Sequence, residues 1–555
     1  MYHDLSMVAI PYEEAPQATP LFQDYIQHFD RVRRFYGNSP FEFASYRDLV
    51  RQIEDRYTDR GALVEILTRQ NQALGCGEET LASIRRLADP DAFAAVTGQQ
   101  VGLFSGPAFT FYKALTAVRV ARSLTEQGLR CVPVFWLATE DHDLDEVAKT
   151  AVWDEAGAIV TLADSGARPA PQSSVGHVKL SPEVSHTIDE LEKILPAGEQ
   201  RDILIHDVRQ CYAPGVTWGK AFGRLMARLF SRFGVVLVDP LDERLHHLSR
   251  RAYERALQGS GNLRELLQKR SRDLIDSGYH AQVHVGDDST LLFAALDGNR
   301  IALRQRDGRF FLEQARAVSA AEMEDWIATR PQDFSPSALL RPVIQDTLLP
   351  TIAYVAGPAE LAYFGQAQTL YPEFGRPMPV LFPRAGFTLA DHRLARIMEK
   401  YQVTLQDVWK GEEHLRRRIA VAGASSGAAE SRPGSSHGPP GQEPGSGRPV
   451  ELAARERENG VESMGAGEQN PAPGREDWAK RLTMAEEAIR RLFGTLSQDV
   501  TPIDSTLVDA VRNSEEKMLY QLDRLKGKIS RAAVQRSELL SRHEQDLLNF
   551  LMPGG

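Results

Sequence analysis

Five short apolar runs, separated by amphipathic stretches with helical periodicity, constrain the fold of this 555-residue chain more than any other feature. The runs are residues 93–96, 132–137, 235–238, 352–355 and 380–382. Strands that are apolar throughout must be covered on both faces, and in parallel sheets the helices between successive strands provide that cover. The pattern therefore predicts an α/β fold whose core is a doubly wound parallel sheet.

A different pattern lies between the third and fourth runs. There, apolar and polar residues alternate, and the pairs Asp297-Gly298 and Asp307-Gly308 interrupt the alternation. Such pairs favour the tight turns of antiparallel hairpins. We expect a small module, inserted into the parallel sheet, at residues 259–335.

The remaining parts of the chain differ in composition. The first 90 residues have a mainly helical pattern, whereas residues 422–475 are rich in Gly, Ser, Pro and Glu and predict a disordered linker. Helical patterns flank the linker at 391–421 and 476–555. The resulting domain prediction is an N-terminal helical segment (1–90), a sheet domain in two parts (91–258 and 336–390), the inserted module (259–335), and a coiled-coil arm (391–421 and 476–555) interrupted by the linker (422–475).

The last segment carries the seam of a coiled coil. Apolar residues repeat there with alternating spacings of four and three, at Met518, Leu522, Leu525, Ile529 and Ala532. The stretch before the linker is a candidate for an antiparallel partner. An arm of this kind favours a homodimer, while a single helix packed along its own domain is an equal alternative.

Charge and cysteine content restrict the partners and the compartment. Lys and Arg total 65 against 75 for Asp and Glu, a net charge of −10, which gives no attraction to nucleic acid or anionic lipid. Cys76, Cys131 and Cys211 are widely spaced and contain no CxxC pair, so neither a disulfide framework nor a cysteine zinc cage is expected. The N-terminus lacks a basic region followed by an apolar run. These features predict a cytoplasmic protein with no nucleic-acid or membrane partner.

A strand, a glycine-rich loop and a helix are predicted over residues 96–124. Gly98, Gly102 and Gly106 let a ligand approach the backbone closely, and Pro107 suits the first turn of a helix. The N–H groups and positive dipole end at the start of that helix favour an anion such as phosphate or carboxylate. The loop matches neither GxGxxG nor GxxxxGK[ST], so a phosphate cradle and a tight turn that needs glycine for packing both remain open.

The helix that follows carries Tyr112 and Lys113 one turn from its start. Lys113 interrupts an otherwise apolar stretch, an inconsistency of the kind found at functional sites. Alternatively, its ammonium group reaches solvent past the apolar surface.

Four polar residues, Glu140, Asp141, His142 and Asp143, follow the second apolar run. Ligands of open parallel sheets bind beyond the carboxyl ends of the strands, where these side chains are expected. Acids beside an imidazole can act as a general base, hold an ammonium group or bind a metal, while capping of a following helix is the structural alternative. A lone histidine without a second, distant one is a poor transition-metal site, so no metal site is predicted.

Polar residues also follow the last two runs. Gly357 and Glu360 come after the fourth run and open a helix, where Glu360 can serve the helix dipole or hydrogen-bond a ribose or a substrate amine. Arg384 comes directly after the fifth run, and Arg341 precedes the fourth. The planar fork of an arginine suits a carboxylate or phosphate, and an exposed structural arginine is the alternative for each.

Together these blocks resemble the bacillithiol-biosynthesis cysteine-adding enzyme family. The resemblance covers nearly the whole chain and is carried by Thr97-Gly98-Gln99-Gln100, Gly102-Leu103, Gly106-Pro107, Tyr112-Lys113, Phe135-Trp136-Leu137-Ala138, Glu140-Asp141-His142-Asp143, Leu340-Arg341-Pro342, Gln345, Leu349-Pro350, Ala353-Tyr354 and Leu381-Phe382-Pro383-Arg384.

The resemblance implies a Rossmann-like core similar to that of class I aminoacyl-tRNA synthetases, a connective-peptide insertion, and a C-terminal coiled coil that pairs subunits. The implied activity is that of a ligase which adds L-cysteine to glucosaminyl-malate, forming the amide that completes bacillithiol. The activating cosubstrate stays open, with ATP and magnesium as one option.

On this basis roles can be assigned to the candidate residues. An activated acyl group must be held and an attacking amine must lose a proton. The residues predicted to be catalytic are Glu140, Asp141, His142, Asp143 and Lys113. The residues predicted to bind substrate or phosphate are Thr97, Gly98, Gln99, Gln100, Gly102, Ser105, Gly106, Tyr112, Arg341, Gln345, Gly357, Glu360 and Arg384. Arg341 or Arg384 would bind the malate carboxylates.

Two other functions fit the pattern less specifically. A nucleotidylyltransferase or another adenylate-forming enzyme can use the same sheet and loop. A non-catalytic scaffold, whose coiled-coil arm recruits partners, is the second alternative.

Overall fold

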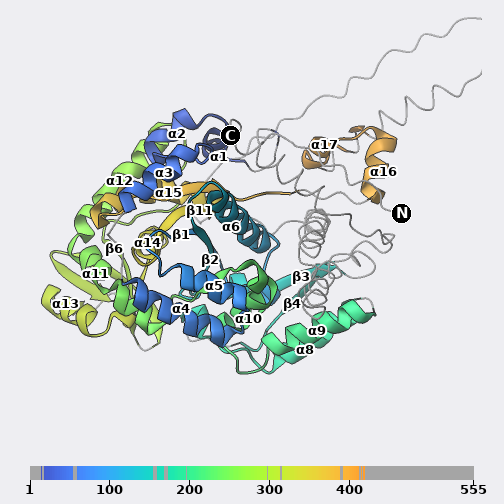
Figure 1. Ribbon diagram of the computed structural model, residues 1–555, viewed down its shortest axis with the longest axis horizontal. Coiled ribbons are helices and arrows are strands. Elements are labelled where there is room, and N and C mark those ends of the chain that lie inside the picture. Colours follow the sequence, from blue (N-terminus) through green and yellow to red (C-terminus); the bar gives the residue numbers. More distant parts are fainter. Residues whose placement is uncertain are drawn as a thin grey trace, which may run out of the picture. The chain divides into compact units, whose positions relative to one another are not determined.

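The computed structural model of the chain (Figure 1) describes residue 14 and residues 18–53, 59–153, 159–167, 173–195, 197–296, 298–312, 316–387, 392–411, 414–415 and 417–418. These residues belong to two separate units, one ending before residue 392 and one beginning there. The linker predicted at 422–475 and the predicted seam from Met518 to Ala532 lie outside the described residues.

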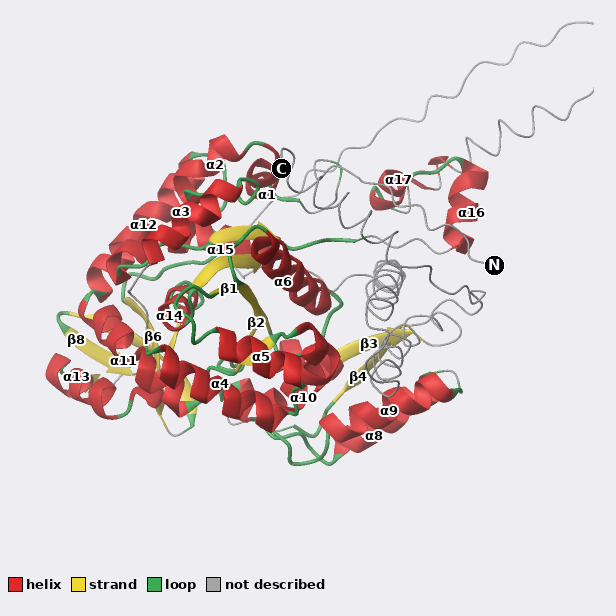
Figure 2. Ribbon diagram, in the orientation of Figure 1, coloured by secondary structure: helices red, strands yellow, loops and turns green. Residues whose placement is uncertain are grey.

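Five parallel strands form the central sheet of the first unit (Figure 2), which confirms the predicted α/β fold. They are β1 (Phe93–Gln99), β2 (Cys131–Leu137), β5 (Val236–Val238), β11 (Thr351–Ala356) and β12 (Val380–Pro383). Four of them contain one of the apolar runs in full, and β5 begins one residue after the start of the run at 235–238. The spatial order β12-β11-β1-β2-β5 is the doubly wound order, in which the first strand of the chain lies at the centre.

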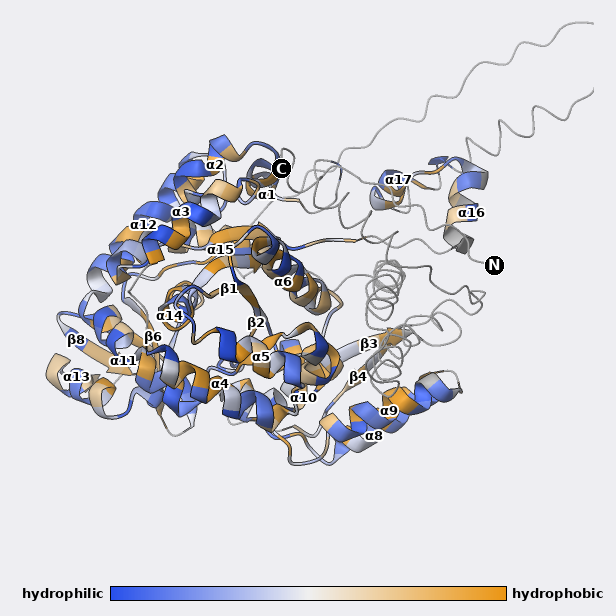
Figure 3. Ribbon diagram, in the orientation of Figure 1, coloured by the Kyte–Doolittle hydropathy of each residue, from blue (hydrophilic) through white to orange (hydrophobic). Residues whose placement is uncertain are grey.

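Helices cover both faces of this sheet. One core contains Phe93 and Ala95 of β1 packed with α3 (Phe43–Ile53) and α6 (Phe109–Glu126). The other contains the alternate residues Ala94 and Val96, together with the helices of the opposite face. Figure 3 shows the hydrophobic colours concentrated on the central strands, while outer helices such as α12 carry long hydrophilic stretches.

The helices of the first unit that complete these layers have the following bounds: α1 (Pro20–Gln27), α2 (Phe29–Tyr36), α4 (Arg60–Leu74), α5 (Glu78–Arg86), α10 (Trp218–Phe230), α11 (Glu243–Gln258), α14 (Arg341–Leu348) and α15 (Pro358–Ala367). Five of the first-unit helices, α1 to α5, lie in the first 90 residues, as the sequence predicts.

The chain changes direction between β1 and β11. The helix after β1, α6, packs on one face of the sheet, and the helix after β11, α15, packs on the other. Loops that leave neighbouring strands toward opposite faces open a crevice at the carboxyl ends of those strands. The fold therefore places the expected ligand site beside Gln99 and Ala356.

The connection from β2 to β5 contains an element that the sequence analysis missed. An antiparallel hairpin of β3 (Lys149–Trp153) and β4 (Ile159–Ala163) follows the short helix α7 (Leu144–Val147), and α8 (Glu183–Ile194) and α9 (Glu199–Cys211) come next. The hairpin forms a separate two-stranded sheet, so its residues do not share the continuous apolar pattern of the central strands.

The inserted module contains the predicted antiparallel hairpins. Its sheet has the order β10-β6-β7-β8-β9, with the bounds β6 (Ser289–Leu296), β7 (Asn299–Arg306), β8 (Arg309–Leu312), β9 (Arg316–Val318) and β10 (Phe334–Pro336). Asp307 and Gly308 join β7 to β8 with φ angles of 48° and 73°, as the predicted tight turn requires. The helices α12 (Ser260–Asp276) and α13 (Ala320–Thr329) complete the module.

The described residues of the second unit are largely helical, in line with the helical pattern at 391–421. They include the short helices α16 (His392–Tyr401) and α17 (Leu405–Trp409), and residues 414–415 and 417–418 are helical as well. Gln402 has a φ of 49°, and the Thr404 side chain accepts a hydrogen bond from the Asp407 N–H at 3.2 Å, which starts a new helix. Among the residues described in both units, no helix is long and apolar enough to cross a membrane.

Candidate functional site

Lys113 lies at the crevice between β1 and β11 and is buried, so its predicted route to solvent is not taken. All three of its ammonium protons have acceptors. Nζ donates to the Gly98 carbonyl at 2.9 Å and to Gln99 Oε1 at 2.8 Å, and it forms an ion pair with Glu360 Oε2 at 2.6 Å. Burial lowers the pKa of Lys113, and Glu360 opposes that shift. A buried ammonium so surrounded is a fixed positive charge at the carboxyl end of β1.

Glu360 connects this charge to β11. Its Oε2 accepts the Gly357 N–H at 2.8 Å, as expected for an acid in the first turn of α15, and its Oε1 accepts the Tyr354 hydroxyl at 2.9 Å. The carboxylate therefore has hydrogen-bond donors on both oxygens. Glu360 therefore has both roles: it stabilises the start of α15, as predicted, and it pairs with Lys113.

Arg341 and Gln345, predicted to bind substrate, lie deeper in the fold on α14. Arg341 donates to the Tyr363 hydroxyl at 2.6 Å and to Gln345 Oε1 at 3.2 Å, and Gln345 is fully buried. The Arg341 guanidinium thus contributes charge to the site from behind Tyr354. Direct contact of Arg341 or Gln345 with a substrate stays a prediction.

Arg384 follows β12 and lies close to the same crevice. Its backbone N–H donates to the Ala356 carbonyl at 2.8 Å, its Nη1 donates to the Ala385 carbonyl at 3.1 Å, and its guanidinium lies 5.5 Å from the centre of the Phe109 ring. The charge of Arg384 also lowers the pKa of Lys113, so the two cations are near each other. Tyr112 is buried against Phe387, and its hydroxyl has no hydrogen-bond partner among the described residues.

The glycine-rich loop after β1 serves packing at several positions. The Thr97 hydroxyl donates to the Val355 carbonyl at 3.0 Å, which ties β1 to β11. A Cβ at Gly98 would lie 2.9 Å from the Trp136 carbonyl oxygen, and a Cβ at Gly102 would lie 2.5 Å from Gly106 Cα. These glycines are therefore required by close backbone contacts, which supports the packing interpretation for them.

The same loop is also strained. Phe104, Ser105 and Gly106 have φ angles of 51°, 85° and 70°, and two of these three residues are not glycine. Such backbone persists where surrounding contacts hold it, and it clusters at ligand sites. The loop leads into α6, where the Thr110 hydroxyl is buried without a hydrogen-bond partner among the described residues. An anion cradle at this helix start stays a prediction.

The four polar residues after β2 point to different surroundings. Asp143 accepts the Glu146 N–H at 3.0 Å and caps α7, which is the structural alternative given above. Glu140 is buried and faces α11, where its Oε1 lies 3.9 Å from His246 Nε2. Asp141 and His142 remain partly exposed. The cluster thus divides: Glu140 is buried, Asp143 is exposed but caps α7, and Asp141 and His142 are open to a substrate.

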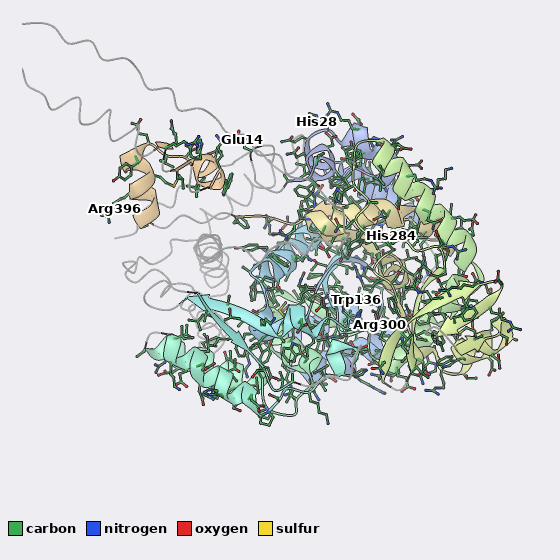
Figure 4. All side chains as sticks on the ribbon, turned by 180° about the vertical axis from the view of Figure 1, so that it is seen from behind. Glu14, His28, Trp136, His284, Arg300 and Arg396 are labelled. Atoms are coloured by element: carbon green, nitrogen blue, oxygen red, sulfur yellow. The ribbon has the colours of Figure 1, made fainter. Side chains whose placement is uncertain are left out.

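Asp141 and His142 are held by residues from two other elements. Asp141 Oδ2 accepts a hydrogen bond from Gln100 Nε2, and its Oδ1 lies 3.4 Å from His142 Nδ1. Arg300 of β7 reaches His142 Nδ1 at 3.3 Å (Figure 4 labels Arg300). Gln99 and Gln100 are neighbours at the end of β1, so one turns toward Lys113 and the other toward Asp141, and they link the two groups.

Arg300 was not identified from the sequence. Its Nε donates to Ser335 Oγ at 2.9 Å, its Nη2 donates to the Pro336 carbonyl at 2.8 Å, and its guanidinium lies 3.7 Å from the centre of the Phe293 ring. These contacts fix the arginine of the inserted module beside Asp141 and His142. Arg300 is one of several arginines in the same hairpin strand, and nothing in the sequence distinguishes it from an arginine that faces solvent.

Glu140 lies in a small cavity of about 10 Å³, which is also lined by Trp136 and His246. Glu140 Oε1 and Trp136 Nε1 have no hydrogen-bond partners among the described residues. Burial raises the pKa of Glu140 to about 7 from an ordinary value of 4.5, and burial lowers the pKa of His246 to about 4. Both groups therefore favour their neutral forms.

Glu140→Gln is expected to flatten the dependence of stability on pH. The folded state binds the proton of Glu140 more tightly than the unfolded chain does, so protonated Glu140 contributes to the free energy of unfolding. This contribution is full below about pH 4.5 and is lost as the pH rises through about 7. The loss amounts to about 3 kcal/mol. Urea denaturation should show that the free energy of unfolding decreases more between pH 5 and pH 8 for the wild-type chain than for the variant. Equal decreases would contradict the burial of an ionisable Glu140.

A larger cleft than the Glu140 cavity lies elsewhere. It has a volume of about 750 Å³ and is lined by residues that include Arg51, Tyr371, Arg376 and Met378. Met378 precedes the first residue of β12, so this cleft lies at the amino-terminal edge of the sheet. The described residues contain no group of three or more His, Cys, Asp or Glu side chains able to hold a metal.

Comparison with known proteins identifies the family. The family model "Bacillithiol biosynthesis BshC, N-terminal Rossmann-like domain" matches residues 5–385, and the model "Bacillithiol biosynthesis BshC, C-terminal coiled-coil domain" matches residues 475–555.

Relatives named "Putative cysteine ligase BshC" match over most of the chain. The one from Koribacter versatilis is 33% identical over 98% of this chain and 91% of its own length. The one from Solibacter usitatus is 33% identical over 97% and 90%, and the one from Salinibacter ruber is 34% identical over 74% and 77%. This chain therefore belongs to the BshC family of bacillithiol biosynthesis, with a Rossmann-like N-terminal domain and a C-terminal coiled-coil domain.

Proposed function

We propose, with membership of the BshC family as the premise, that this chain is a ligase that joins L-cysteine to glucosaminyl-malate in the last step of bacillithiol biosynthesis. Two relatives that this chain matches over 90% or more of their own length carry the name "Putative cysteine ligase BshC". The observation that carries the proposal is the pairing, at one edge of the sheet, of buried positive charge with an exposed acid and imidazole. Amide formation needs both kinds of group.

Positive charge would hold the acyl side of the reaction. Lys113, Arg341 and Arg384 lie close enough that each arginine affects the pKa of the lysine, and Glu360 is the carboxylate paired with Lys113. The excess positive charge favours a carboxylate or phosphate in the crevice and stabilises negative charge that develops on the acyl oxygen. Fixed groups are effective because they need no reorganisation during the reaction.

The exposed pair would act on the amine. The sugar ammonium must lose a proton before its nitrogen attacks the acyl carbon, and His142 Nε2 would accept that proton while the Nδ1–H faces Asp141 Oδ1 at 3.4 Å. In this tautomer Arg300, 3.3 Å from Nδ1, acts through its charge and donates no hydrogen bond to that nitrogen. The new C–N bond forms as the leaving group departs from the acyl carbon. Malate carboxylates would be bound by Arg384 or Arg341, as predicted.

The activating cosubstrate belongs to the same proposal. ATP with magnesium would supply an activated acyl phosphate or adenylate, and the loop from Gly102 to Gly106 with the start of α6 is the segment suited to its phosphates. No step of the mechanism above depends on magnesium. The class I synthetase-like core and the connective-peptide role of the inserted module are likewise inferred from the family resemblance.

Product analysis tests the proposal. Purified full-length protein is incubated with L-cysteine and glucosaminyl-malate, with and without ATP and magnesium, and the products are identified by mass spectrometry. The amide of cysteine is expected, and L-serine in place of cysteine should give little product. Transfer of a nucleotidyl group without amide formation would instead support the nucleotidylyltransferase alternative.

We also propose that the C-terminal coiled coil pairs two subunits. Replacing Leu522 and Ile529 together by Asp should convert a dimer to monomers, because two charges would enter the apolar seam of each helix. Sedimentation of the wild-type and double-variant chains measures the change. An unchanged mass in the variant would reject the seam.

A further inference from the structure

A chain of hydrogen bonds leads from Lys113 into the interior, partly buried near Lys113 and fully buried at Asp346. Glu360 pairs with Lys113 at 2.6 Å and accepts the Tyr354 hydroxyl at 2.9 Å. Arg341 Nη2 reaches the Tyr354 hydroxyl at 3.4 Å and that of Tyr363 at 2.6 Å. Among the described residues, the side chains that accept hydrogen bonds from Arg341 are neutral, and the carboxylates that balance its charge, Glu360 and Asp346, lie one residue further along the hydrogen bonds.

The chain continues along α14. Arg341 Nη1 donates to Gln345 Oε1 at 3.2 Å, and Gln345 Nε2 donates to Asp346 Oδ1 at 3.0 Å. The Tyr371 hydroxyl donates to Asp346 Oδ2 at 2.7 Å. Gln345 is fully buried and Asp346 is 1% exposed, so solvent does not screen them. Asp346 thus lies at the inner end of an unbroken path to Lys113.

The charges along this path balance only when Asp346 is ionised. Lys113 and Arg341 are the cations, and Glu360 and Asp346 are the carboxylates. Arginine does not release its proton in proteins, so Lys113 is the cation that responds when a carboxylate is neutralised. A buried charge that loses its counterion is strongly disfavoured.

We propose that Asp346 is a positioning residue for the candidate site: at the far end of the path through Gln345, Arg341 and Tyr354, its negative charge favours the charged form of Lys113 and so maintains the pairing of Lys113 with Glu360. The catalytic use of Lys113 rests on the proposed function, whereas the pairing does not. Asp346 acts on Lys113 from outside the crevice, because its carboxylate accepts hydrogen bonds from Gln345 and Tyr371 and lies at the other end of the path from Lys113 and Glu360.

The groups around Asp346 and around Lys113, the two ends of the path, support this role. Burial raises the pKa of Asp346 to about 6, against hydrogen bonds from Tyr371, Thr351 and Gln345 and the charge of Arg341. Burial lowers the pKa of Lys113, Glu360 raises it, and Arg384 and Arg341 lower it. Above about pH 6 the ionised Asp346 offsets the effect of Arg341 on Lys113, and below that pH the offset is lost.

The experiment is an NMR titration of the full-length chain carrying lysine labelled with ¹³C at the ε carbon. The Lys113 signal is identified by its absence in Lys113→Met. In the wild-type chain this signal should show a small inflection near pH 6, from Asp346, below its own titration. Asp346→Asn, which has nearly the same shape and no charge, should remove that inflection and lower the pKa of Lys113 by roughly one unit.

Two control variants separate Asp346 from its neighbours. Tyr371→Phe removes a donor to the carboxylate but leaves the charge, so the inflection should move to higher pH and persist. Glu140→Gln removes another buried carboxyl group, whose pKa is raised to about 7, and should leave the inflection unchanged.

The outcomes decide the proposal whether or not every variant folds. An Asp346→Asn chain in which Lys113 titrates as in the wild type would overturn it. If that variant does not fold, a wild-type signal without an inflection, or an inflection insensitive to Tyr371→Phe, would overturn it equally. The remaining outcome separates the two proposals. If Asp346→Asn removes the inflection and lowers the pKa of Lys113, but the wild-type chain forms no cysteine amide, the role of Asp346 in the pairing is upheld and the proposed function is rejected.

Discussion

Lys113→Met is expected to lower the rate of cysteine-amide formation by about 10²- to 10³-fold. The variant removes a fixed positive charge at the crevice between β1 and β11, where negative charge on the acyl group is expected to develop. It also leaves Glu360, whose side chain is 15% exposed, without its cation, which costs at most about 3 kcal/mol of stability, the low end for a buried pair. Mass spectrometry measures the rate, and urea denaturation measures the stability.

A double variant separates the two effects of that substitution. Lys113→Met with Glu360→Gln removes both charges of the pair, so much of the lost stability should return while the rate stays low. A double variant that recovers the wild-type rate would show that Lys113 serves folding alone. Normal activity in the single variant would remove the lysine from the mechanism.

Asp141→Asn is expected to lower the rate by about 10²- to 10⁴-fold with little change in stability. The aspartate is partly exposed and orients His142, which is proposed to take the proton of the attacking amine. The amide of asparagine keeps the shape but cannot stabilise the imidazolium that forms. His142→Ala should have an effect of similar size, measured by the same product assay.

Asp145→Asn is the matched control for this prediction. Asp145 is exposed, lies four residues after Asp141 in the first turn of α7, and loses the same charge. Its variant should retain nearly the wild-type rate. Equal losses in the two variants would mean that only the overall negative charge of this segment matters.

The central sheet was predictable because burial on both faces leaves a clear trace in the sequence. Each of the five apolar runs became a strand, and the turn at Asp307 and Gly308 marked a hairpin. The hairpin of β3 and β4 left no comparable trace, since it lies outside the sheet core. The break at Gln402 depends on a local cap that helical periodicity does not record.

The edge that holds the site was also predictable, but the orientation of its side chains was not. Strand ends place Gln99, Asp141 and Arg384 on the same edge of a parallel sheet. Which side chain turns inward depends on the packing of other elements, as for Glu140 against α11. Arg300 reaches the site from a module that is distant in sequence, and only the folded chain brings it to His142.

A crystal structure of the chain with glucosaminyl-malate and L-cysteine bound tests the central claim most directly. Both molecules are expected beyond the carboxyl ends of β1, β2 and β11, with the amine of the sugar near His142 and the cysteine carboxyl near Lys113. Binding of the substrates instead in the 750 Å³ cleft at the opposite edge, beside Arg376, would contradict the account.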